Sequence, residues 1–147
     1  MVVRRERVVP AAPAEVWGIV SDPTRLAAWW PGVSRVEEAS RDAWTTVLVS
    51  KTGKTVRADY SLVEAEEPQR VLWRHEVAAS PFERLLRDST TEIALAADDA
   101  GGTRVRVTLD QHPRGWARFS PLQLRAAARR QAELALEGLA GLLGDGR

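Results

Sequence analysis

The sequence predicts an α+β fold: a seven-stranded antiparallel sheet, a long C-terminal helix, and two short helices between the first and second strands. Three observations predict it. A β-branched N-terminal segment precedes two short helical patterns, hydrophobic residues then alternate with a period of two, and a long amphipathic pattern follows. The turns between the alternating segments are too short for the crossovers that parallel strands need, so neighbouring strands must be antiparallel.

The N-terminal segment predicts a strand and two helices. VVRRERVV at 2–9 is compact and β-branched, which favours a strand. Pro13 begins the first helix, because the first turn does not need its missing N–H group. Ser21-Asp22-Pro23 ends that helix and begins a second one, with Asp22 as its N-cap. Pro31-Gly32 ends the second helix.

Six segments of the middle region are predicted to be strands, separated by turn-rich joints. They are SRVEEAS, AWTTVLVSK, TVRADYSLVEA, RVLWRHEVA, STTEIALAA and TRVRVTLDQ. The joint from Ser80 to Leu86 has capping-box spacing and predicts one or two helical turns. This joint is either a surface connection or a flap over a cavity.

The segment from Ser120 to Leu143 is predicted to be a long amphipathic helix. Its apolar stripe consists mostly of Ala in the first half and Leu in the second, through Leu124, Ala128, Gln131 or Ala132, Ala135, Leu139 and Leu142. The small residues leave space beside the helix.

Composition limits the classes of function. The chain of 147 residues is expected to form one domain (1–147), and its net charge of +1 argues against nucleic-acid binding. It has no apolar run long enough for a membrane span, no signal peptide and no Cys, so we expect a cytoplasmic protein without disulfides. With two His and no zinc, P-loop or dinucleotide motif, we expect no metal and no cofactor. No feature indicates an oligomeric state.

The order of elements resembles the START-like helix-grip superfamily, and more closely its polyketide cyclase/dehydrase and lipid-transport (SRPBCC) branch. The matching motifs are Pro13-x-x-Val16-Trp17, Asp22-Pro23-x-x-Leu26-x-x-Trp29, Pro68-x-Arg70-x-Leu72 and Gly101-Gly102-Thr103-Arg104-Val105. This resemblance implies that the sheet curves around the long helix, with a deep apolar cavity between them. It also implies that a polyketide, a lipid or an isoprenoid-like molecule binds there.

The strand at 70–77 carries two candidate catalytic residues on opposite faces. If its apolar face lines the cavity, His75 points inward and would polarise a carbonyl or shuttle a proton. The alternative for His75 is an ordinary core histidine. In the opposite register Arg74 would be the cation of the pocket, a use of Arg that the resemblance implies.

The two adjacent Trp residues are expected to differ in role. Neighbouring positions on a helix diverge by about 100°, so both rings cannot enter one slot. Trp29 is expected to anchor the second helix, whereas Trp30 lies towards the cavity mouth, as anchor or as ligand contact. The full set of predicted ligand-binding residues is Trp30, Trp44, Tyr60, Trp73, His75, Gln111 and Gln131. Trp116 and Phe119 would line the entrance or pack at the start of the last helix.

Three functions remain open on these residues. The first is binding of a hydrophobic small molecule. The second is a polyketide cyclase, aromatase or dehydratase that uses His75 or Arg74. The third is a protein-interaction module of the chaperone- or ribosome-associated kind, for which the arginine cluster between Arg114 and Arg130 would be the docking surface, unless it is simply a solvated helix face.

Overall fold

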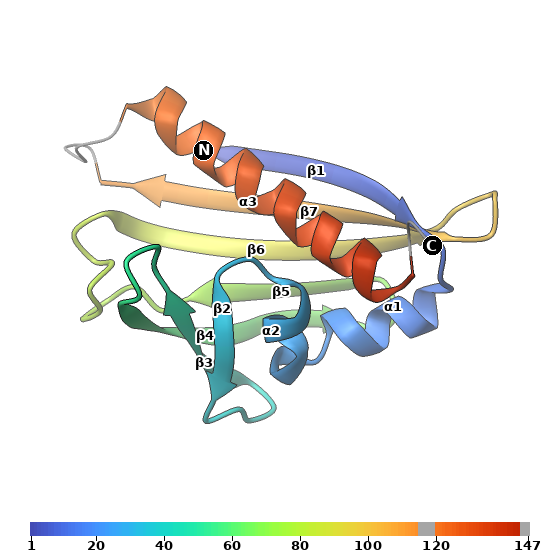
Figure 1. Cartoon of the computed structure of the whole chain (residues 1–147), viewed down its shortest axis with the longest axis horizontal. Helices are drawn as coiled ribbons and strands as arrows, with labels where there is room; N and C mark the ends of the chain where they lie inside the picture. The colour runs from blue at the N-terminus through green and yellow to red at the C-terminus, as the bar shows by residue number, and fades with distance from the viewer. Residues whose placement is uncertain (115–119, 145–147) are drawn as a thin grey trace.

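The computed structural model describes residues 1–114 and 120–144 (Figure 1). Its elements, in chain order, are β1 (Val2–Val9), α1 (Pro13–Val20), a 3₁₀ turn η1 (Pro23–Arg25), α2 (Leu26–Trp29), β2 (Val33–Glu37), β3 (Ala43–Val49), β4 (Thr55–Glu66), β5 (Arg70–His75), β6 (Leu86–Ala97), β7 (Thr103–Pro113) and α3 (Pro121–Leu142). The predicted order of strand, two short helices, six strands and a long helix is confirmed.

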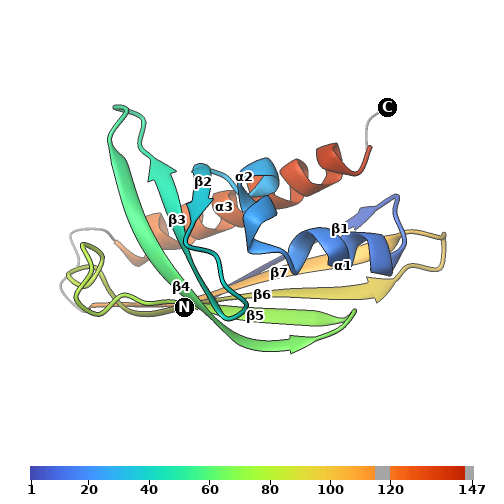
Figure 2. The ribbon, with the colours of Figure 1, turned by 90° about the horizontal axis from the view of Figure 1, so that it is seen from below.

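The strands form one antiparallel sheet in the order β1-β7-β6-β5-β4-β3-β2. Figure 2 shows that the sheet curves, so that β3 and β4 stand at a steep angle to β6 and β7. The helix α3 crosses the concave side and packs on β1 and β7 (Figure 1). This curved antiparallel sheet around a C-terminal helix is the helix-grip fold.

The core lies between the concave face and α3. Its largest fully buried side chains include Ile93 of β6, Val105 and Val107 of β7, and Leu139 of α3. The alanine-rich part of α3 faces the sheet as predicted, since Ala128, Ala132 and Ala135 are buried. The end of the predicted stripe is wrong: Leu142 is exposed, and Leu136 and Ala140 are buried instead.

Between Ser80 and Leu86, where one or two helical turns are expected, the structure has hydrogen-bonded turns that do not form a helix. Phe82 accepts hydrogen bonds through its carbonyl oxygen from the N–H groups of Leu85 (2.9 Å) and Leu86 (3.0 Å), which makes a turn and no helix. Leu86 already belongs to β6, where it pairs with Pro113 of β7. Because Leu86 pairs in the sheet, a helix that begins at Pro81 cannot continue through it.

The second predicted helix is divided into η1 and α2. Asp22 caps its start as predicted, because Asp22 Oδ1 accepts a hydrogen bond from the Thr24 N–H at 3.0 Å. The end of α2 lies directly on α3 at Gly138. A Cβ atom at Gly138 would lie 2.4 Å from the Trp29 carbonyl oxygen, so only glycine permits this approach. None of the described helices is long and apolar enough to cross a membrane.

Candidate functional site

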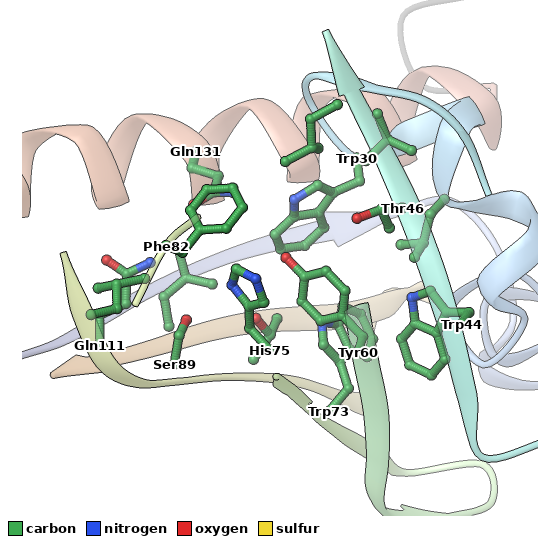
Figure 3. Close-up of a pocket in the computed structure, with 16 residues that line it drawn as sticks. Trp30, Trp44, Thr46, Tyr60, Trp73, His75, Phe82, Ser89, Gln111 and Gln131 are labelled. Carbon is green, nitrogen blue, oxygen red and sulfur yellow. The ribbon is translucent and has the colours of Figure 1, made fainter. Parts of the chain in front are cut away.

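A cavity of about 170 Å³ lies between the concave face of the sheet, α2 and α3 (Figure 3). All seven residues predicted to bind a ligand line this cavity: Trp30, Trp44, Tyr60, Trp73, His75, Gln111 and Gln131. They come from α3, from the residue after α2, and from strands β3, β4, β5 and β7. The curvature of the sheet brings these elements together around one space.

The adjacent pair Trp29 and Trp30 takes two different positions. The Trp29 side chain is buried in the core and is only 3% exposed. Trp30 follows the last residue of α2, has extended backbone angles, and lines the cavity. The two rings meet edge to face, with centroids 5.3 Å apart. The end of α2 at Trp29, and not the angle between two helical residues, thus separates an anchor from a cavity wall.

One end of the cavity is walled by aromatic rings. Trp44 and Tyr60 are stacked with centroids 6.0 Å apart and planes within 7°. Trp73 meets Trp44 edge to face at 6.0 Å and Trp30 at 5.9 Å. The strands β3, β4 and β5 are neighbours in the sheet, and alternate residues point to the same face, so the rings must meet.

His75 lies between two other rings near the middle of the cavity (Figure 3). It stacks on Tyr60 with centroids 4.8 Å apart, and Phe82 meets it edge to face, also at 4.8 Å. The residue is 6% exposed, and its buried Nε2 atom has no hydrogen-bond partner among the described residues. Such an unpaired buried polar atom costs about 1–3 kcal/mol.

Burial sets the ionisation of this part of the site. It lowers the pKa of His75, and the negative charges of Asp59 and Glu76 oppose this shift only partly. Burial raises the pKa of Tyr60 to about 12, against the effect of the neighbouring Thr46 hydroxyl. Near neutral pH the cavity therefore contains a neutral imidazole and a protonated phenol.

Arg74 is not a residue of this cavity. It lies on the opposite face of β5, where its Nε atom is 3.3 Å from Asp88 Oδ1 and its side chain is 46% exposed. The alternative register, with Arg74 as the pocket cation, is thus wrong, because Val71, Trp73 and His75 are the buried residues of β5. Larger apolar area on that face decides which side turns inward.

The sequence predictions missed several lining residues, among them Phe82, Ser89 and Thr91. Ser89 and Thr91 share the face of β6 that continues into buried Ile93, so alternation alone could have identified them. Alternation could not identify Phe82, because Phe82, Leu85 and Leu86 have the i, i+3, i+4 spacing of a helix. Its contact with His75 places this part of the joint between β5 and β6 at the cavity.

Two arginines of the predicted cluster bond to the backbone of the chain. Arg114 Nε donates to the Glu83 carbonyl oxygen at 2.5 Å, and Arg125 donates to the Val2 carbonyl oxygen at 3.3 Å. Arg129 and Arg130 are exposed on α3. Arg118, Trp116 and Phe119 lie outside the described residues. Two of the four described arginines therefore hold the backbone of the chain itself.

Within residues 1–114 and 120–144, His, Asp and Glu do not gather into a group that could hold a metal ion. The same residues show an uncharged cavity: none of those that line it is Asp, Glu, Lys or Arg.

We expect acid to weaken the fold through His75. Because its pKa is lowered in the folded protein, the unfolded chain binds a proton below about pH 6.5 that the folded chain binds less readily. The free energy of unfolding should therefore fall as the pH decreases through this range, and His75 should have no such effect above it. Denaturant titrations from about pH 7.5 to about pH 5.5 would measure the slope.

The control for this effect is the other histidine. His75→Phe should remove the His75 part of the slope, whereas His112→Gln, which changes an exposed residue, should keep it. An equal slope in the wild type and in His75→Phe would contradict the assignment.

The fold and the uncharged aromatic cavity define a helix-grip protein with an internal pocket. The chain belongs to the family described as polyketide cyclase/dehydrase and lipid transport, which it matches over residues 1–144. No curated protein matches the sequence significantly.

Solved structures share this fold at low sequence identity. A START superfamily protein from Mycobacterium smegmatis is 14% identical, with a TM-score of 0.80, over 97% of this chain and 96% of that one. A protein from Thermus thermophilus is 21% identical, with a TM-score of 0.74, over 97% of each chain. The di-domain ARO/CYC StfQ from the steffimycin biosynthetic pathway is 12% identical, with a TM-score of 0.75, over 97% of this chain and 50% of that one.

Proposed function

We propose that the protein binds a hydrophobic small molecule in the cavity between the sheet and α3. The observation that carries this proposal is the cavity itself, which is uncharged, has a wall of aromatic rings and contains a few polar side chains. Pockets of this composition are typical of small-molecule sites. Membership of a family whose description names polyketides and lipids supports the same class of ligand.

The test is direct binding. The purified protein would be extracted for mass spectrometry, and then titrated by calorimetry with naphthol, methylnaphthalene, naphthoate, palmitate and pyrene. We expect at least one of these compounds to bind, or a copurified apolar molecule to be found. Absence of both would contradict the proposal.

Trp30 is expected to be the main ligand contact. Trp30→Ala should weaken the binding of whichever probe binds by tenfold or more, or about 1.4 kcal/mol, because buried aromatic anchors dominate such sites. The matched control is Val49→Ala, which removes an exposed apolar side chain at the end of β3. Equal affinities of the two variants for the probe would show that Trp30 does not contact the ligand.

A second candidate function is acid–base catalysis on the bound molecule, as in a polyketide cyclase, aromatase or dehydratase. The neutral, enclosed imidazole of His75 favours it, since such a group can take up or deliver a proton. With a reactive polyketide as substrate, His75→Ala should lower the rate of cyclisation by about a hundredfold or more. An equal rate in this variant would leave binding as the function.

A further inference from the structure

The size of the cavity limits its ligand more than family membership does. A cavity of about 150 Å³ holds a benzene molecule, whereas pockets for larger ligands have about 300–1,000 Å³. The volume of this cavity, about 170 Å³, is close to that of the benzene-sized cavity and below the range for larger ligands. Its walls enclose one or two fused aromatic rings, whereas a four-ring molecule or a long acyl chain would extend beyond them.

The charge of the lining limits the ligand further. No Asp, Glu, Lys or Arg among the described residues lines the cavity, so an ionised ligand would lose its hydration without gaining an ion pair. That loss costs several kcal/mol per ion. An uncharged ligand avoids it.

Four polar side chains lie on one side of the cavity, and the Thr46 hydroxyl lies on the other side, near Trp44. Figure 3 shows Gln111, Ser89, Gln131 and His75 on the side away from Trp44, while the stacked and edge-to-face rings form the other end. A ligand that fits both ends has a flat apolar body and one polar group.

Among the described residues, two side chains of the cavity wall have a buried polar atom without a partner, Trp44 at Nε1 and His75 at Nε2, and of these only the imidazole also carries an acceptor. Its Nε2 atom is buried and unpaired, and the rings of Tyr60 and Phe82 hold the imidazole between them. A neutral imidazole carries one N–H donor and one bare acceptor nitrogen. A hydroxyl group both donates and accepts, so it can pair with either nitrogen, whereas a carbonyl can pair only with the N–H.

We propose that the ligand of this cavity is an uncharged compound of one or two fused aromatic rings whose hydroxyl group hydrogen-bonds the His75 imidazole. This inference rests on the proposed function and names the ligand class of the same site. The rings lie against Trp30 and Trp73, and the hydroxyl points to the end that His75, Gln111 and Gln131 share.

Four probes that differ in hydroxyl group, charge and size test the ligand class by calorimetry. Naphthol and methylnaphthalene have nearly the same shape and differ in the hydroxyl, naphthoate adds a charge, and pyrene adds size. In the wild-type protein we expect naphthol to bind at least tenfold more tightly than each of the other three. Equal affinity for naphthol and methylnaphthalene, or tighter binding of naphthoate or pyrene, would overturn the proposal.

The variant His75→Phe tests the role of the imidazole. Phenylalanine can keep the contacts with Tyr60 and Phe82, so naphthol should lose about tenfold in affinity while methylnaphthalene loses little. An undiminished preference for naphthol in a folded His75→Phe protein would also overturn the proposal. If this variant does not fold, the four probes on the wild-type protein still decide the ligand class.

The results also separate this inference from the proposed function. If palmitate or pyrene binds and naphthol does not, the cavity is a binding site and the ligand class is wrong. If no probe binds and no molecule copurifies, the proposed function fails as well.

Discussion

Replacing Trp29 by alanine is expected to lower the free energy of unfolding by about 3–5 kcal/mol. Trp29 is the last residue of the four-residue helix α2, and its buried indole is a main contact of this helix with the core. Its removal leaves a cavity and also removes the edge-to-face support of Trp30. Denaturant unfolding monitored by circular dichroism would measure the loss.

Two further variants isolate the cause. Trp29→Phe should cost much less, because a ring remains and the buried Nε1 atom of Trp29 has no hydrogen-bond partner to lose. Trp30→Ala should also cost less, since Trp30 is only partly buried and borders open space. A loss in Trp29→Ala no larger than that in Trp30→Ala would show that Trp29 is not the anchor.

Replacing Gly138 by alanine is expected to lower the free energy of unfolding by about 1–3 kcal/mol. Within a helix this substitution normally stabilises by up to about 1 kcal/mol, so the expected sign is reversed. The reason is the contact at the end of α2, where the new Cβ would lie 2.4 Å from the Trp29 carbonyl oxygen and 3.2 Å from Trp29 Cα. Backbone atoms cannot move aside as a flexible side chain can.

The same helix provides a matched control. Gly141 also lies in α3, and no atom lies within 4 Å of the Cβ that alanine would add there. Gly141→Ala should leave the protein as stable as the wild type or slightly more stable, as helix propensity predicts. Thermal unfolding of the two variants gives the comparison, and two changes of the same sign would rule out close packing at Gly138 as the cause.

Much of the fold could be predicted because its signals are local. The alternation of Val105, Val107 and Leu109 shows one covered face of β7, and Asp22-Pro23 marks a helix start. Errors occurred where a longer-range contact overrode a local pattern. Leu86 has helical spacing from Phe82 but pairs with Pro113 in the sheet, an interaction that no local window contains.

Seven of the residues that line the cavity could be predicted, but the inward face of β5 could not. Trp73 and His75 share a face by alternation, but Leu72 on the other face left the choice of the inward side open. Packing of Trp73 against Trp30 and Trp44 places that face inward, and Arg74 then points outward to Asp88. Phe82 could not be predicted because its position follows from a turn and not from any periodic element.

The pairing of β1 with β7 has a consequence for folding of the chain during its synthesis on the ribosome. Val9 pairs with Thr103 and Val2 pairs with Asp110, so the first strand must wait for the last one to be synthesised. Hairpins from β3 to β7 can form earlier, since consecutive strands are neighbours in the sheet. Contacts between such distant parts of a chain are slow to form. The nascent chain therefore exposes one edge of β7 until its N-terminus returns, which is when premature association with other chains is most favoured.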